Sequence, residues 1–213
     1  MPKVKDCISV SWDTLKKNPW IIIGVFVCMF ALSGVLNGFL TAFLPIEGPD
    51  ATPGSSAMNF FLSMTIGALI EIGLVTFVLK AQSAADTLSF HDLWNPQPFL
   101  RYLIAQLLVA VTVLVGFVLL IIPGIIAGIA LMFTPYLVVD KHLTPIDAMK
   151  ESLRMTKGNR WELFLLMLAL LLLNFLGMFA FFVGLLVTIP MSMLAIAHVY
   201  RILESAPESI PTA

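Results

Sequence analysis

The chain has little charge for its length. Its 213 residues include 12 Lys and Arg and 13 Asp and Glu, so 12% are charged, whereas 59% are hydrophobic. A soluble domain carries about 25% charged residues, and half that amount leaves too little polar surface to face water. The shortage argues against a soluble domain and predicts a surface that faces lipid. A net charge of −1 also gives no basis for nucleic-acid binding.

Cysteine and the common catalytic patterns are also scarce. Cys7 and Cys28 are the only cysteines, and on one continuous helix they would lie about 30 Å apart, beyond disulfide reach. His91, His142 and His198 form no cluster of metal-ligand spacing. The sequence has no Ser/His/Asp arrangement, no Gly-rich phosphate loop and no paired acids within an apolar stretch. We therefore expect no metal, no cofactor and no catalysis.

Long apolar runs dominate what is present. They recur at about 20–44, 58–80, 98–122, 124–139, 161–176 and 184–200. A helix needs about 20 apolar residues to cross about 30 Å of hydrocarbon. The pattern predicts an all-α polytopic membrane bundle, in which six transmembrane helices form three hairpins. Residues 1–213 would make a single membrane domain, with a flexible tail at 205–213.

The basic residues can all be placed on one side of that membrane. They are Lys3, Lys5, Lys16, Lys17, Lys80, Arg101, Lys141, Lys150, Arg154, Lys157, Arg160 and Arg201. Lys and Arg in short loops mark the cytoplasmic side, so we expect both termini in the cytoplasm of a bacterium and the protein in its inner membrane. Rings that prefer the headgroup layer fall at the same boundary: Trp12, Trp20, Trp94, Trp161, Tyr102, Tyr136 and Tyr200.

Three cytoplasmic segments have the pattern of amphipathic interfacial helices, at 3–17, 89–94 and 145–157. In the last, Thr144 is a suitable N-cap, with Asp147 three residues later as in a capping box. Gly158 and Asn159 would end the helix. Its apolar stripe is Ile146, Met149 and Leu153, and its basic stripe is Lys150, Arg154 and Lys157.

Two of these segments match each other in sequence. Asp6, Ser11, Lys16, Asn18 and Trp20 correspond to Asp147, Ser152, Lys157, Asn159 and Trp161 at a constant offset. Each set leads directly into an apolar run. Either the chain contains an internal repeat, with a degenerate copy ending at Trp94, or similar helices converged on similar residues. A repeat would give three units, each made of a surface helix and a hairpin.

One region resembles a known group of proteins. The matching segments are 120–126 (LIIPGII), 134–140 (TPYLVVD) and 157–161 (KGNRW), together with Ala148 and Ser152. They resemble a group of poorly characterised bacterial six-span membrane proteins, similar to the membrane domain attached to some glycerophosphodiester phosphodiesterases. The resemblance is best over 117–166. It implies a membrane module with cytoplasmic termini and carries over no catalytic residue.

Glu71 is the most unusual residue, because it lies near the middle of the second apolar run. A carboxylate costs about 2.5 kcal/mol or more at the bilayer centre, so it must be protonated, paired or in contact with water inside the bundle. It could serve an ion or proton pathway, or it could be a structural hydrogen-bonding group. Gln106 and Thr112 on the third run lie at similar depths and are the expected partners.

The remaining polar and helix-breaking residues are expected to join the spans or to interrupt them. Asn37 and Asn174 fit interhelical hydrogen bonds. Pro123 and Gly124 predict a hairpin tip, and Pro135 and Pro190 predict kinks or broken helices within spans. The uncharged turns at 123–124 and 177–184 are compatible with an end inside the bilayer or at its surface.

The basic residues near the membrane surface either set topology or bind lipid headgroups. The candidate headgroup-binding residues are Lys16, Lys17, Lys150, Arg154, Lys157 and Arg160. Our first hypothesis is a non-catalytic scaffold or lipid-interacting module. Its partners would be membrane lipids, anionic ones included, and a second copy or another membrane protein. The alternative is a small transporter or channel centred on Glu71.

Overall fold

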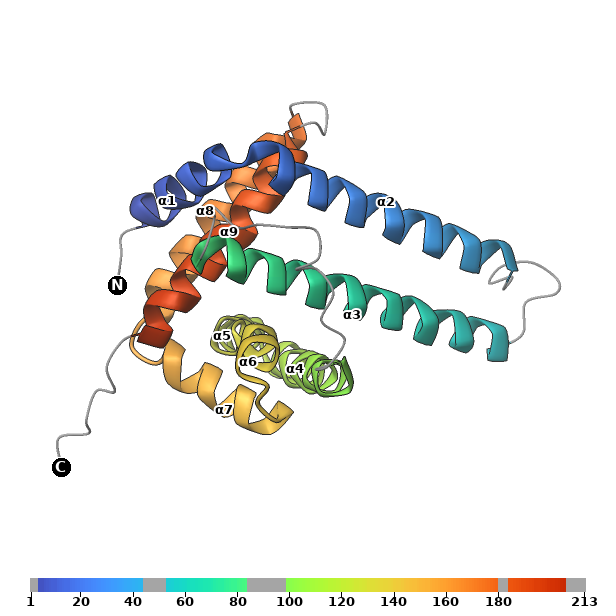
Figure 1. The fold of residues 1–213 in the computed structure, drawn as a ribbon. Helices are drawn as coiled ribbons and strands as arrows, with labels where there is room; N and C mark the ends of the chain where they lie inside the picture. The colour runs from blue at the N-terminus through green and yellow to red at the C-terminus, as the bar shows by residue number, and fades with distance from the viewer. Residues whose placement is uncertain (1–3, 44–52, 84–98, 180–183, 206–213) are drawn as a thin grey trace.

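The computed structural model describes residues 4–43, 53–83, 99–179 and 184–205. Within these ranges the chain forms helices and no strand, so the predicted all-α fold is confirmed. The helices, labelled in Figure 1, are α1 (Val4–Lys17), α2 (Pro19–Phe43), α3 (Pro53–Ser83), α4 (Phe99–Leu119), α5 (Ile121–Leu131), α6 (Thr134–Lys141), α7 (Pro145–Thr156), α8 (Arg160–Phe179) and α9 (Leu185–Ser205). The predicted surface helix at 89–94, the residues 180–183 of the last turn and nearly all of the predicted tail lie outside the described residues.

Six stretches of these helices are long and apolar enough to cross a membrane. They are Pro19–Phe43, Ala57–Ser83, Phe99–Leu119, Ile121–Lys141, Arg160–Phe179 and Leu185–Ser205. Each predicted apolar run overlaps one of them along most of its length. The fourth combines α5 and α6, which a break at Met132 and Phe133 separates. The six-helix membrane bundle expected from the sequence therefore agrees with the fold.

The three hairpins are α2–α3, α4 with α5–α6, and α8–α9, and they leave a shared body in different directions (Figure 1). In each hairpin the first helix is the outer one. The most apolar 18 residues of the three first helices are 17%, 17% and 22% buried, against 39%, 50% and 44% in the second helices. The core is therefore built from α3, α5–α6 and α9, while α2, α4 and α8 face outward.

The burial pattern follows the register of the proposed repeat. Buried residues stand at both members of five matched pairs: Cys7 and Ala148, Ser11 and Ser152, Leu15 and Thr156, Ile22 and Leu163, Val25 and Leu166. Asn18 and Asn159 both accept a backbone hydrogen bond at the start of the next helix, from Ile22 N at 3.1 Å and Leu163 N at 3.0 Å. α1 packs on α9, and α7 packs on α5 and α6, so each surface helix covers the second helix of another hairpin.

In two of the hairpins, a pair of glycines brings the two arms of the hairpin into close contact. A Cβ on Gly116 of α4 would lie 2.9 Å from the Gly124 Cα of α5, and a Cβ on Gly184 would lie 2.5 Å from the Gly177 carbonyl oxygen of α8. Lipid tails are as apolar as the side chains, so helix association in a membrane depends on such close packing. Only glycine fits these four positions without displacement of a neighbour.

The tip of the second hairpin differs from the sequence prediction. The chain turns at Leu120, whose backbone is extended, and α5 already begins at Ile121. Pro123 and Gly124 lie inside the first turn of α5 and do not break a helix there. Proline is tolerated in a first turn because its missing N–H would have had no helical acceptor. Gly124 serves the approach of α4 instead of the reversal.

Of the other two prolines, Pro135 lies beside a break between two helices and Pro190 lies inside a continuous helix. Pro135 follows the break between α5 and α6 and occupies the first turn of α6. Pro190 lies inside α9, which continues through it to Ser205. Pro190 therefore does not divide this span into two helices, which was one of the two predicted outcomes, although it removes one backbone donor from the helix.

The surface helix α7 begins as predicted but orients its faces differently. The Thr144 hydroxyl oxygen accepts from Asp147 N at 3.3 Å, which caps the helix. The buried face consists of Ala148, Ser152, Met155 and Thr156, and apart from Met155 these residues are small or polar. Two members of the predicted apolar stripe, Ile146 and Leu153, are instead exposed, 59% and 40% respectively. They lie on the same outward face as the basic residues.

Candidate functional site

The Glu71 carboxylate is paired within the bundle. Gln106 of α4 donates from Nε2 to Glu71 Oε2 of α3 at 3.0 Å and lies 3.1 Å from the Tyr102 hydroxyl. Tyr102 of α4 and Tyr136 of α6 are both buried, and the Glu71 carboxylate interacts electrostatically with each of them. Side chains from α3, α4 and α6 thus meet at one intramembrane polar cluster, which we call the Glu71 cluster.

The other predicted intramembrane polar residues lie elsewhere. Thr112 is exposed and donates to the Leu108 carbonyl of its own helix at 2.7 Å. Asn37 donates to the Ser33 carbonyl of α2 at 2.9 Å. Asn174 joins α8 to α9, because its Nδ2 lies 2.8 Å from Ser192 Oγ. Of the four residues proposed for one polar site, only Glu71 and Gln106 come together.

Sequence reasoning missed the tyrosines of this region. Tyr102, Tyr136 and Tyr200 were expected in the headgroup layer, but their exposed fractions are 0%, 5% and 0%. Tyr136 and Tyr200 pack with ring centroids 5.6 Å apart. Trp12, Trp20 and Trp161 are exposed as expected, and Trp94 lies outside the described residues. A tyrosine near a charged segment can lie at a lipid interface or make a hydrogen bond in the core. Its position along the chain therefore could not show which of these two environments it occupies.

A second polar network joins α6 to α9 where the two helices end. Arg201 contacts both oxygens of Asp140, from Nη1 at 2.8 Å and from Nη2 at 3.0 Å. Tyr200 donates its hydroxyl to Asp140 Oδ2 at 2.9 Å, and Glu204 accepts from Arg201 Nη1 at 2.9 Å. Lys141 extends the network to Glu204 at 3.3 Å. Sequence reasoning assigned Arg201 to topology alone, and no local motif predicted this bidentate pair.

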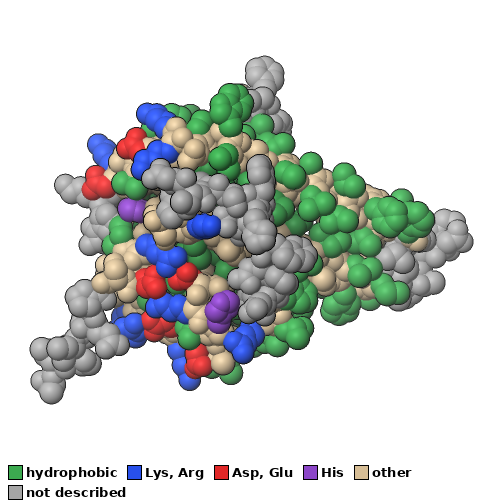
Figure 2. Space-filling model, in the orientation of Figure 1, with side chains coloured by type: hydrophobic (Ala, Val, Ile, Leu, Met, Phe, Trp, Pro, Cys, Tyr) green, Lys and Arg blue, Asp and Glu red, His purple; other side chains and the backbone are tan. Residues whose placement is uncertain are grey.

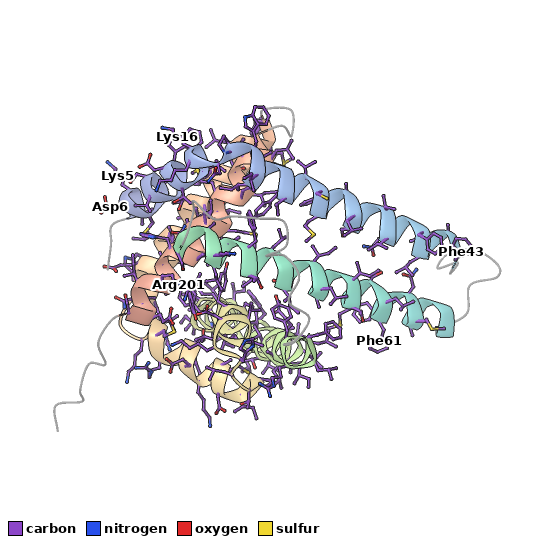
Figure 3. The ribbon with its side chains drawn as sticks, viewed as in Figure 1. Lys5, Asp6, Lys16, Phe43, Phe61 and Arg201 are labelled. Atoms are coloured by element: carbon purple, nitrogen blue, oxygen red, sulfur yellow. The ribbon has the colours of Figure 1, made fainter. Side chains whose placement is uncertain are left out.

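Charged side chains gather at one end of the molecule, whereas apolar side chains cover the projecting α2–α3 hairpin (Figure 2). Figure 3 shows Lys5, Asp6 and Lys16 on α1 at the charged end, with Phe43 and Phe61 far away on the hairpin. Lys150 and Arg154 are exposed on α7, Lys157 directly after it and Arg160 at the start of α8. We call these four residues the basic face.

Two other candidate headgroup-binding residues lie apart from the basic face. Lys16 and Lys17 are exposed at the end of α1, and Lys16 Nζ lies 5.2 Å from the centroid of the Trp12 ring. On α7, Glu151 pairs with Arg154 at 2.6 Å, and this hydrogen bond holds the pKa of the Glu151 carboxyl below its usual value. The charges of α7 are therefore partly offset within the helix itself.

Within the described part of the chain, no group of three or more His, Cys, Asp and Glu side chains could hold a metal ion. The arrangement therefore offers two kinds of chemistry. One is hydrogen bonding inside the bundle, at the Glu71 cluster and at Asp140. The other is attraction of anions by an exposed basic face beside exposed apolar side chains.

Comparison with known proteins places this chain beside uncharacterised relatives. Residues 101–206 match the model of a family described as "Protein of unknown function (DUF975)". Uncharacterised proteins of Mycobacterium tuberculosis and Mycobacterium bovis are 28% identical over 221 residues, which cover 93% of this chain and 67% of each relative. No solved structure matches the chain with significance. None of these descriptions names a phosphodiesterase, so the likeness to that membrane domain stays a prediction.

Proposed function

We propose that this protein is a non-catalytic scaffold of the bacterial cytoplasmic membrane that binds anionic lipid headgroups through its basic face. Both termini would lie in the cytoplasm, and the partners would be lipids together with a second copy or another membrane protein. The module would resemble the membrane domain of glycerophosphodiester phosphodiesterases in architecture, without their chemistry.

The observation that carries this proposal is the composition of the outward face of α7. Its exposed basic residues, Lys150, Arg154 and Lys157, stand beside the exposed apolar side chains of Ile146 and Leu153. A helix with this mixture is suited to the boundary between headgroups and acyl chains. Each basic residue near an anionic surface contributes about 1 kcal/mol of attraction. A face used only for topology would not require the exposed isoleucine and leucine.

A charge-reversal variant tests the proposal. Purified protein is reconstituted with equal amounts of phosphatidylglycerol and phosphatidylcholine, and the lipids retained after re-extraction are measured by native mass spectrometry. We expect the wild type to retain phosphatidylglycerol preferentially, and K150E/R154E/K157E to lose most of that preference. The single variant K5E is the control, since Lys5 lies on α1 away from the basic face. Equal lipid retention by the triple variant and the wild type would contradict the proposal.

The transport alternative rests on Glu71 and requires that water or ions reach its carboxylate. The hydrogen bond from Gln106 instead suits a structural role, because it joins α4 to Glu71 on α3. Flux measured in liposomes with the wild type and with E71Q separates the two roles. Flux that E71Q abolishes in a folded protein would favour transport over the scaffold.

A further inference from the structure

An apolar groove lies between α5 and α8 at the foot of the basic face. Its wall is formed by four isoleucines of α5 and by Trp161 and Phe164 of α8, and its volume is about 330 Å³. The isoleucines are Ile122, Ile125, Ile126 and Ile129. Trp161 stacks on Phe164 with ring centroids 5.5 Å apart, which keeps one wall flat. Both helices belong to membrane spans, so acyl chains surround this groove.

Arg160 gives the groove a charged end. Arg160 lines the groove together with these apolar side chains, and it is exposed. An arginine in such a place keeps its aliphatic stem on apolar surface while its charged head reaches the headgroup layer. Among the described residues, neither a hydrogen bond nor an ion pair occupies the Arg160 guanidinium. The groove therefore combines an apolar wall with a positive charge that no acidic side chain among the described residues compensates.

We propose that this groove is a specific site for one anionic phospholipid, with an acyl chain along the four isoleucines and the phosphate at Arg160. The inference rests on the proposed function and narrows it to one site and one class of lipid. A soluble anion would find no polar group along the wall. A lipid satisfies both parts of the site at once, because its apolar chain and its charged headgroup are joined in the same order as the groove and Arg160.

The protein contains a natural counterpart that lacks the charge. A second groove of about 190 Å³ lies between α2 and α9 and is lined by Phe26, Phe30, Leu185, Leu186, Ile189 and Pro190. In the register of the proposed repeat α2 corresponds to α8, but Pro19 and Trp20, the counterparts of Arg160 and Trp161, do not line this second groove. Both grooves have an apolar wall, and of the two the α5–α8 groove alone has an arginine in its lining, so we expect that groove to select an anionic lipid.

Native mass spectrometry with defined lipids tests the site. Wild type, R160Q and the control K5Q are each reconstituted with equal phosphatidylglycerol and phosphatidylcholine, and the most tightly held lipid is identified. We expect one retained phosphatidylglycerol on the wild type and on K5Q. R160Q should lower the preference for that lipid about fivefold, the effect of one lost basic contact.

A filling variant, I126W, tests the apolar half of the site and should reduce retention of either lipid. Its melting temperature in detergent is compared with that of the wild type, and if I126W does not fold, the comparison of R160Q with K5Q tests the site. A preference that R160Q and K5Q change equally would overturn the site while leaving the basic face intact. Absence of any preference in the wild type would remove the proposed function as well. If the wild type instead forms dimers without retained lipid, and I126W abolishes those dimers, the groove is an interface with a second copy and the lipid site is refuted.

Discussion

Ser152 shows how a single hydroxyl sustains a break in a membrane helix. The interruption at Met132 and Phe133 frees backbone groups that a continuous helix would have paired. The Ser152 hydroxyl donates to the Ala130 carbonyl at 2.8 Å and accepts from Phe133 N at 3.2 Å. An unpaired backbone group inside a bilayer is costly, so α7 contributes to the stability of α5–α6 by this contact. The break is therefore tied to the surface helix that covers it.

Replacement of Ser152 by Ala should destabilise the protein by about 1–3 kcal/mol, because the Phe133 N–H loses its acceptor. The matched position in α1 provides the control. Ser11 is equally buried, but its hydroxyl donates only to the Cys7 carbonyl of its own helix, at 2.7 Å. S11A should therefore change stability little. Thermal unfolding in mild detergent measures both, and equal losses in the two variants would contradict the assigned role.

The Glu71 cluster makes a second prediction for single residues. Gln106→Leu leaves the Glu71 carboxylate without one of its partners and should cost about 1–3 kcal/mol. Glu71→Gln keeps a hydrogen-bonding amide of the same shape and should cost less. Thr112→Val serves as the control, since Thr112 is exposed and its hydroxyl donates to a carbonyl of its own helix. The order of the three melting temperatures tests the cluster, and a larger loss in T112V than in Q106L would refute it.

Between helices, small residues replace the hydrophobic effect as the main source of association. Apolar side chains gain little from leaving lipid, so the hairpins depend on the close approach that Gly116, Gly124, Gly177 and Gly184 permit. The contacts are not equally rigid. A Cβ on Gly124 would meet the movable ring of Phe117, whereas one on Gly116 would meet the backbone of Gly124. The Gly116 position therefore has the least room to adjust.

Gly116→Ala should destabilise the second hairpin by about 1–3 kcal/mol through overpacking. Gly128→Ala is the matched control, because it adds a methyl group to α5 where nothing lies within 4 Å. That change should be neutral or stabilising by up to about 1 kcal/mol, as alanine is the better helix former. Detergent unfolding curves, with limited proteolysis to locate the change, compare the two variants. A stable G116A would show that the hairpin can open without cost.

Periodicity and length predicted the helices because a membrane span is set by composition over about 20 residues. Local chemistry also predicted the Thr144 cap, whose partner Asp147 is three residues away. Features that join distant parts of the chain were harder to predict. The Asp140–Arg201 pair spans 61 positions, and no motif marks it. The hairpin tip was misplaced because Pro123 suits a first helical turn as well as a turn between helices.

At the scale of the whole molecule, the charge distribution and the proposed repeat both indicate a charged base from which apolar hairpins project. The charged residues gather at one end (Figure 2), which is also where α1 and α7 lie. The second helix of each hairpin is buried and the first faces outward. Within the described residues two units have this order, α1 with α2–α3 and α7 with α8–α9, and each has a surface helix at the charged base followed by an apolar hairpin. The two native cysteines occupy one such unit, Cys7 in its surface helix and Cys28 in its first span.

The orientation of that unit can be measured by cysteine labelling. Burial raises the pKa of the Cys7 thiol, and the nearby Asp6 carboxylate raises this pKa further, so little thiolate forms near pH 7. Cys28 is exposed on an apolar span, where lipid surrounds it. A charged, membrane-impermeant maleimide should therefore label the native chain in neither intact cells nor inverted vesicles, and should label it after denaturation in SDS.

Lys150→Cys then adds one reactive thiol to the basic face, and it should be labelled in inverted vesicles but not in intact cells. The reason is that Lys150 is exposed at the charged end, which the distribution of Lys and Arg assigns to the cytoplasm. Labelling of K150C in intact cells would reverse the orientation. Rapid labelling of Cys7 without denaturant would mean that α1 detaches from α9, so that the charged base is not the packed layer on which the three hairpins stand.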